Sequence, residues 1–303
     1  MRDRHNAFTT TDALLLLMAL IWGVNYSAVK YGGHALTPLL FTWARVLGAA
    51  ITLLAAALIQ RRLEGTPWPT RRDAIALLAL GIVGNGLYQL CFVFGVARTR
   101  VADAVLIVAS APAIIAIISR MRGIEHLRPR VITGIAITIA GVGIVLVGSA
   151  THAATHAATQ QQGTLLGVVL VSAGVIFWSI YTVAVQPYTV RVEPVQLNAL
   201  TMVGGFIPLV FLTPMALGTP LVHNAPSLAW WCLLYSSVVS LGIAYLFWYR
   251  GIKVLGPTRT AAYANLQPVV AILTGWILLG ETPTVVQAVG TVTIIGGIFL
   301  TRA

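Results

Sequence analysis

Long apolar runs are the feature that most restricts how this chain can fold. Each run has about 20 residues, the length that a helix needs to cross the hydrocarbon core of a membrane. Strands of a membrane barrel would instead form segments of about 10 residues that alternate apolar and polar side chains, and none of the runs alternates in this way. The ten runs lie at about 12–30, 38–59, 74–97, 101–120, 131–149, 164–186, 195–216, 228–249, 258–280 and 284–301. The sequence therefore predicts an all-α polytopic membrane protein with ten transmembrane helices.

The scarcity of charge supports the same fold class. Charged side chains make up 9% of the 303 residues and hydrophobic ones 58%, whereas a soluble domain has about 25% charged residues. This composition excludes a soluble enzyme, a disordered chain and a heptad coiled coil. Arg2 and Arg4 precede the first run as in a signal peptide, but the run continues through Trp22 and Val29 without a small-residue cleavage site. We therefore expect an uncleaved first span.

The positive charge predicts the orientation of the chain. Nearly all of the 19 lysines and arginines fall in the segments that share one side with the N-terminus, and only Lys30, Arg98 and Arg100 fall on the other side. Short cytoplasmic loops are enriched in lysine and arginine. We therefore expect a multi-pass protein of the cell inner membrane with both termini in the cytoplasm. The net charge of +11 is interpreted as a topology signal and not as a nucleic-acid surface.

The two halves of the chain repeat each other at a constant shift of 156 residues. The matched pairs are Trp22/Trp178, Pro38/Pro194, Gly48/Gly204, Gly95/Gly251, Pro112/Pro268, Glu125/Glu281, Gly134/Gly290 and Gly141/Gly297. Each half contains five spans, and because five is odd, the second half must enter the membrane from the opposite side. The predicted organisation is a first repeat at 1–150, an extracytoplasmic connector at 151–163 and a second repeat at 164–303. Such inverted repeats are typical of secondary transporters.

Three sequence motifs resemble a known family. The segment 251–281, GIKVLGPTRTAAYANLQPVVAILTGWILLGE, resembles the signature of the drug/metabolite transporter superfamily, EamA type, and the first half carries a weaker copy with Ala-Pro at 111–112 and Gly-Ile-Glu at 123–125. The segment TPLLFTWARVLGAA, which contains Arg45, is similar to the second span of that family. The resemblance covers nearly the whole chain. It implies ten helices, two five-helix repeats and export of small metabolites, and the amino-acid exporters, including those for aromatic amino acids, look closest.

Aromatic and amide side chains inside the spans predict a central cavity. Several recur at helical spacing on one face, and unsatisfied amides are costly in hydrocarbon. Plain hydrogen bonding between helices is the alternative, and Tyr249, Trp230 and Trp231 are interpreted as an interfacial belt. The expected substrate-binding residues are Trp22, Asn25, Tyr26, Asn85, Tyr88, Phe92, Trp178, Tyr181, Trp248, Tyr263 and Gln267. Such a lining suits an amphipathic substrate with an aromatic or other hydrophobic side chain.

Three further residues stand out within the spans. Arg45 is the one formal charge deep in a span, and such a charge indicates either a site for a substrate carboxylate or a side chain that extends to the membrane interface. Pro112 and Pro268 lie mid-span at equivalent places, where each removes a backbone hydrogen bond and kinks its helix. They are expected to be hinges of opposed gates or static bends.

The acidic residues lie at span ends or in loops, Asp103 among them, and the histidines lie there too. Proton-coupled carriers usually keep such a group inside a span, so we expect facilitated diffusion, or coupling through Asp103. No metal or other cofactor is expected, because Cys91 and Cys232 are isolated and the pair His152 and His156 supplies too few ligands for zinc.

The sequence thus favours a secondary transporter that exports small amphipathic metabolites by alternating access, with amino acids of aromatic or other hydrophobic type as the preferred substrates. The expected partners are the substrate and the lipid bilayer, without nucleic acid, and the expected functional unit is a monomer. The alternatives are an exporter of drugs or other metabolites with the same fold, a nucleotide-sugar carrier, and an intramembrane enzyme. A nucleotide sugar would call for several cavity cations, and an enzyme would need a nucleophile–base set or a metal cluster.

Overall fold

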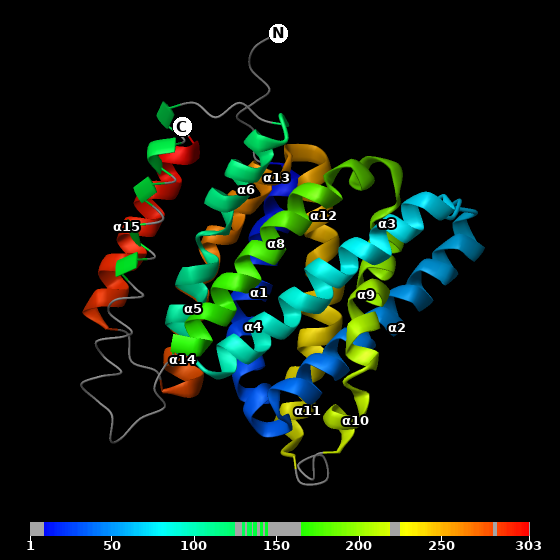
Figure 1. Cartoon of the computed structure of the whole chain (residues 1–303), viewed down its shortest axis with the longest axis horizontal. Helices are drawn as coiled ribbons and strands as arrows, with labels where there is room; N and C mark the ends of the chain where they lie inside the picture. Colours follow the sequence, from blue (N-terminus) through cyan, green and yellow to red (C-terminus); the bar gives the residue numbers. More distant parts are fainter. Residues whose placement is uncertain are drawn as a thin grey trace.

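The computed structural model describes residues 9–124, 165–218, 225–280 and 284–302, with parts of 129–144. The described residues form a helical bundle without strands, and six helices are long and apolar enough to cross a membrane (Figure 1). These six are α1 (Thr10–Leu36), α2 (Pro38–Glu64), Arg71–Ala97, Val101–Met121, α8 (Leu165–Arg191) and Ser227–Leu255. Shorter apolar helices follow at α9 (Pro194–Val210), α14 (Gln267–Leu279) and within α15 (Val285–Arg302). The all-α polytopic prediction is confirmed, and these helices are compatible with ten spans.

Several predicted features lie outside the described residues. They are the connector 151–163, Glu125, Glu281 and most of the fifth predicted span at 131–149. Short helices complete the described chain: α10 (Thr213–Leu217) follows α9 and extends the seventh predicted span.

The first helix is longer than the sequence indicated. Thr9 caps its start, where Oγ1 accepts a hydrogen bond of 3.3 Å from Asp12 N and the Asp12 side chain accepts one from Thr9 N. The helix then runs to Leu36, beyond the predicted end at residue 30, and α2 begins at Pro38. Lys30, at the predicted end of the first span, therefore lies within α1: it is buried, and its Nζ donates to the carbonyl oxygen of Thr99 at 2.8 Å.

Two spans contain π-helical turns at equivalent places. In the first repeat, η1 (Ile82–Leu87) separates α3 (Arg71–Gly81) from α4 (Tyr88–Ala97). In the second, η3 (Tyr235–Ile243) separates α11 (Ser227–Leu234) from α12 (Ala244–Leu255). The wider turn of η3 presents backbone carbonyls to side chains: Trp22 Nε1 donates to Ser240 O at 3.2 Å, and Asn198 Nδ2 donates to Leu241 O at 3.0 Å. Such turns often occur at functional sites.

Two other spans are broken, again at equivalent places. The helix Val101–Met121 consists of α5 (Val101–Val108) and α6 (Ala111–Met121), and the second repeat has α13 (Pro257–Tyr263), a 3₁₀ turn η4 (Ala264–Leu266) and α14. Pro112 and Pro268 lie in the first turn of α6 and α14, where the missing N–H has no intrahelical partner to lose. The prolines therefore start new helical segments and do not kink continuous helices.

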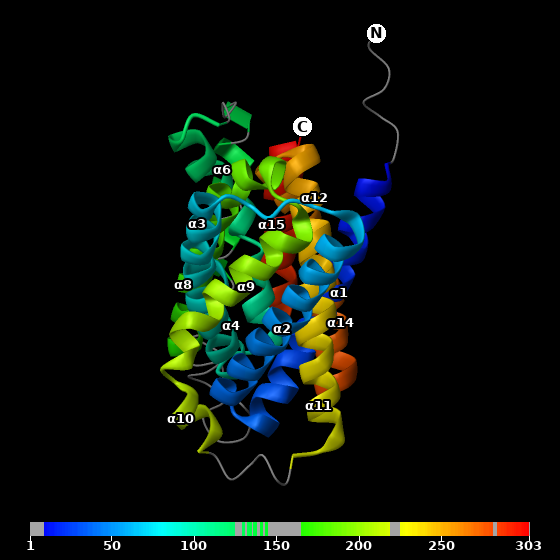
Figure 2. The same ribbon diagram turned by 90° about the vertical axis from the view of Figure 1, so that its right-hand side faces the viewer.

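Helices of the two repeats pack against each other, and equivalent helices, related by the shift of 156 residues, make equivalent contacts. Helix α1 packs on α12 and α14, and its counterpart α8 packs on α4 and α6. Figure 1 shows α1 and α8 running in opposite directions, as an inverted repeat requires. The start of α1 and the end of α15 lie at the same end of the bundle (Figure 2).

Glycines allow the closest helix contacts. A Cβ on Gly95 would lie 2.6 Å from Val171 Cγ2, where α4 meets α8 at one end of the bundle. A Cβ on Gly251 would lie 2.8 Å from Leu15 Cδ2, where α12 meets α1 at the other end. Both contacts have the same partners under the shift of 156 residues, so each end of the bundle is packed in the same way.

Candidate functional site

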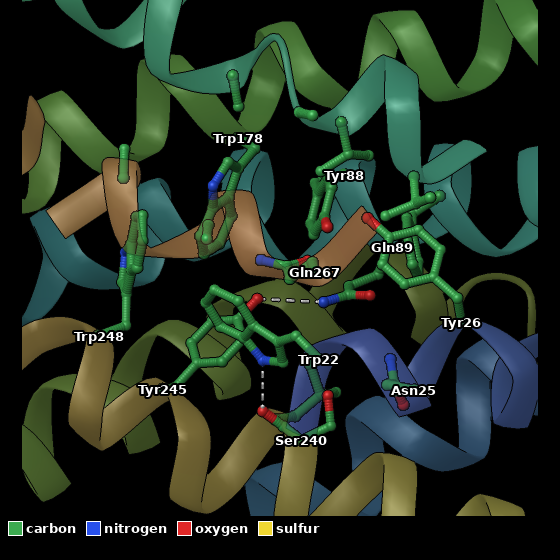
Figure 3. A pocket seen from close by; sticks show the side chains of 18 of the residues that line it. Trp22, Asn25, Tyr26, Tyr88, Gln89, Trp178, Ser240, Tyr245, Trp248 and Gln267 are labelled. Atoms are coloured by element: carbon green, nitrogen blue, oxygen red, sulfur yellow. Dashed lines mark hydrogen bonds between the residues drawn. The ribbon is translucent and has the colours of Figure 1, made fainter. Parts of the chain in front are cut away.

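A cavity lies between the two repeats, beside the π-helical turns and the helix breaks (Figure 3). The empty space inside it, including the part open to solvent, is about 640 Å³. The lining residues are Trp22, Asn25, Tyr26, Arg45, Tyr88, Gln89, Phe92, Val105, Val108, Ala109, Ala111, Pro112, Ile115, Trp178, Ser240, Leu241, Tyr245, Trp248, Ala261, Ala264, Gln267 and Pro268.

The cavity lies on the pseudo-two-fold axis that relates the repeats. Two pairs of residues that are 156 positions apart touch each other in it. The rings of Trp22 and Trp178 meet edge to face with centroids 5.8 Å apart, and Gln89 Nε2 donates to Tyr245 Oη at 3.2 Å. Residues that exchange under a two-fold rotation can touch only near the axis. The cavity therefore lies where the two repeats meet and where both contribute residues from equivalent positions.

Aromatic rings form most of the cavity wall. Trp178 is at their centre, with centroid distances of 5.2 Å to Tyr88, 5.3 Å to Trp248 and 5.5 Å to Tyr245. Tyr26 and Phe92 meet edge to face at 5.2 Å. Figure 3 shows the rings of Trp178, Tyr88, Trp22 and Tyr245 surrounding Gln267. Such rings can stack on a planar or apolar group of a ligand.

Some polar groups of the cavity wall are hydrogen-bonded within the protein. Trp22 donates to Ser240 O, and Asn25 Oδ1 accepts from Ser236 Oγ at 2.7 Å. A few buried lining atoms lack a hydrogen-bond partner among the described residues: Arg45 Nε and Nη1, Trp248 Nε1 and Gln89 Oε1. Buried polar atoms are paired in the great majority of cases, so each of these atoms calls for a partner from outside the described residues.

Arg45 is the only charged residue in the cavity wall within the described part of the chain. It extends from α2, its side chain is 1% exposed, and its guanidinium lies 5.9 Å from the centre of the Phe41 ring. It forms no ion pair with a carboxylate of a described residue. The guanidinium is therefore enclosed at the cavity and does not extend to the protein surface.

The structure brings together most of the residues that the sequence singled out. Trp22, Asn25, Tyr26, Tyr88, Phe92, Trp178, Trp248 and Gln267 line the cavity, as do Arg45, Pro112 and Pro268.

Three expected binding residues lie elsewhere. Tyr181 is buried beside α9, where its hydroxyl is hydrogen-bonded to that of Tyr249. Asn85 lies in η1 and packs against Gly205 of α9. The hydroxyl of Tyr263 donates to a carboxylate oxygen of Asp12 at the start of α1.

Tyr249 is also not in an interfacial belt, because it is 1% exposed and lies within the bundle. Trp230 and Trp231 are exposed. Tyr245, Gln89 and Ser240 are cavity residues outside the expected binding set. The repeat could have predicted Tyr245, because Tyr245 lies 156 positions after Gln89, which belongs to a polar stripe.

Comparisons with known proteins agree with this architecture. A model of the EamA-like transporter family matches residues 9–147 and, 156 positions later, residues 165–303. An uncharacterised transporter of Archaeoglobus fulgidus is 26% identical over 97% of both chains. The uncharacterised inner membrane transporter YedA of Escherichia coli K12 is 28% identical over 88% of this chain and 82% of its own. A solved crystal structure with 22% identity covers 96% of both chains with a TM-score of 0.67, which shows a shared fold.

Proposed function

The chain belongs to the EamA-like transporter family, and from this premise we propose that it exports small amphipathic metabolites across the inner membrane by alternating access. The preferred substrates are amino acids with aromatic or other hydrophobic side chains. The observation that carries this proposal is the aromatic cavity on the pseudo-two-fold axis. Its rings can stack on a hydrophobic side chain while the amides and hydroxyls beside them bind the polar end of the molecule.

The charge of the cavity supports the same substrate class. Arg45 is the single cation among the described lining residues, whereas the phosphates of a nucleotide sugar would call for several. A zwitterion or a monoanion of modest size fits this lining better. An exporter of drugs or other metabolites is the second candidate, because the predominantly aromatic wall fixes the shape of its ligand only loosely.

The symmetry of the site supports alternating access. Inverted repeats can exchange their conformations about a midplane site, which opens the site to each side in turn. The helix breaks before Pro112 and Pro268 lie at the cavity in equivalent positions. We assign them the role of hinges in a functional monomer with both termini in the cytoplasm.

The proposed mode of transport is facilitated diffusion. In the described part of the chain, no Asp or Glu lines the cavity, so a proton relay through the binding site has no carboxylate to use. If transport were coupled to protons, Asp103 would be the acid that couples it. Asp103 is 1% exposed, and its Oδ1 accepts a hydrogen bond of 2.6 Å from Gln287 Nε2.

A counterflow assay in reconstituted vesicles tests the proposal. We expect labelled phenylalanine, leucine or methionine to exchange across the membrane, without a requirement for a pH gradient. Trp178→Ala removes the central ring and should reduce exchange about 2- to 10-fold, because an aromatic pair is worth about 0.5–1.5 kcal/mol. Trp231→Ala is the matched control, since that ring is exposed. Robust transport of nucleotide sugars with no exchange of these amino acids would refute the substrate class, and a strict need for a pH gradient would refute facilitated diffusion.

A further inference from the structure

Arg45 is a buried cation whose hydrogen-bonding groups are only partly used. Its Nε and Nη1 have no partner among the described residues, although the side chain is 1% exposed and lines the cavity. A buried charge without a partner is costly. A ligand could supply the missing partner of this guanidinium, and the cavity is the space next to it.

The second repeat shows that the fold itself does not need this charge. The position equivalent to Arg45 is Thr201 in α9, which is fully buried and donates to Asn198 O at 3.1 Å. Thr201 Oγ1 lies 3.4 Å from Tyr249 Oη, and Thr201 does not line the cavity. A small neutral side chain fills one of the two equivalent positions without an unpaired group. The cation at the other is therefore not explained by packing.

The chemistry of the free atoms indicates their ligand. Nε and Nη1 lie on different edges of the guanidinium plane, and each can donate a charge-assisted hydrogen bond to a carboxylate oxygen. Trp248 Nε1 is a further unpaired donor in the same wall, and Gln89 Oε1 is an unpaired acceptor. No carboxylate of the protein lines the cavity in the described part of the chain. A carboxylate carried in by the substrate would supply the missing partner.

We propose that Arg45 is the carboxylate subsite of this transporter and makes a carboxylate the obligatory charged group of its substrates. This inference rests on the proposed transport function and goes further, because it identifies the group that the carrier must recognise. The aromatic wall would accept many apolar groups, whereas the guanidinium would reject molecules whose only charge is positive. A cationic amphiphile would place like charges together in an enclosed site, which is unfavourable.

Three compounds that share one phenyl group test the proposal on the purified wild-type protein. They are L-phenylalanine, its amide, which lacks the carboxylate, and 3-phenylpropionate, which lacks the amino group. Binding is measured from the quenching of tryptophan fluorescence, since Trp22, Trp178 and Trp248 line the cavity. We expect both carboxylates to bind at least about tenfold more tightly than the amide. Equal binding of the amide, or no binding of either carboxylate, would overturn the subsite.

Variants assign the preference to Arg45. Arg45→Gln should abolish the preference for carboxylates, and Arg45→Lys should retain it in part, because the charge stays but the planar donor group is lost. Arg61→Gln, an exposed arginine on the same helix, is the matched control and should bind as the wild type does. A preference that persists in folded Arg45→Gln would overturn the proposal, and if that variant does not fold, the ligand series on the wild type decides.

The outcomes separate this proposal from the function on which it rests. If 3-phenylpropionate binds through Arg45 but phenylalanine does not, the subsite stands and the amino-acid substrate fails. If phenylalanine is exchanged in vesicles equally well by the wild type and Arg45→Gln, the transport function stands and the subsite fails.

Discussion

The two sides of the cavity have the same backbone plan and different interiors. On the α1–α2 side, Asn25 and Arg45 face the cavity. On the α8–α9 side, the equivalent positions hold Tyr181 and Thr201, which are fully buried. The hydroxyl of Tyr249 bonds to that of Tyr181 and lies 3.4 Å from Thr201 Oγ1. Tyr181 and Thr201 thus take part in a buried network around Tyr249, whereas Arg45 has unpaired donors at the cavity.

The lining residues of the cavity are arranged symmetrically, whereas their polar chemistry differs between the two repeats. Pairs that line the cavity from both repeats, such as Gln89 with Tyr245 and Phe92 with Trp248, lie around the axis. The charge is present on one side only among the described lining residues. A carrier needs the symmetric part in order to alternate between two states, whereas recognition of an asymmetric ligand needs only one copy of the charged group.

The largest effect is expected from exchanging the residues of the two sides. Thr201→Arg would bury an unpaired cation within the buried network, and it should destabilise the protein by more than about 3 kcal/mol. Arg45→Thr places the residue of the other repeat at the cavity and should stay within about 1 kcal/mol of the wild type, because it removes a buried charge. Thermal unfolding of both variants in detergent measures the difference. Equal losses would show that the two sides do not differ as described.

The next effect concerns a pair of equivalent glycines. A Cβ on Gly204 would lie 2.1 Å from the backbone oxygen of Leu78, which cannot move aside, whereas a Cβ on Gly48 would lie 2.5 Å from the side-chain oxygen of Ser237. Gly204→Ala should therefore cost about 1–3 kcal/mol, as overpacking does, and Gly48→Ala should cost clearly less. The midpoints of thermal unfolding measure this. A larger loss for Gly48→Ala would contradict the close packing of α3 on α9.

The smallest effect distinguishes the two tryptophans at the axis. Trp22 Nε1 donates to the backbone oxygen of Ser240 in η3, and Trp178 has no such bond in the described structure. Trp22→Phe should cost about 1 kcal/mol more than Trp178→Phe, which is the usual net value of one hydrogen bond. The same unfolding assay applies. Identical stabilities would mean that the indole does not support the π-helical turn.

Hydropathy and the internal repeat predicted much of the architecture. Apolar runs identify membrane helices because lipid requires every backbone group to be paired within the helix. The shift of 156 residues predicted the related halves, since Gly95 and Gly251 mark helix contacts that recur in both. Side chains such as Trp22 and Trp178 were found because aromatic rings inside a span have few purely structural roles.

One cause of error is that helix faces were derived from an uninterrupted period of 3.6 residues. A π-helical turn inserts a residue and rotates the remainder of the helix by about 100°. Asn85 lies in η1 and contacts α9, whereas Tyr88 begins α4 and faces the cavity, although the α-helical period places them on one face. The turn depends on donors from other helices, such as Asn198 and Trp22 for η3. Tyr249 was misplaced because α12 continues to Leu255 and keeps it inside the bundle.

The glycine contacts at the two ends of the bundle have a thermodynamic consequence. Gly95 packs on Val171 where α4 meets α8, and Gly251 packs on Leu15 where α12 meets α1. A methyl group added at either glycine would act as a wedge at that end alone. In the proposed alternating-access mechanism, closing of one end accompanies opening of the other, so the two substitutions should shift that equilibrium in opposite directions. Each end of the molecule thus has a glycine whose substitution would shift the same conformational equilibrium, and neither glycine lines the cavity.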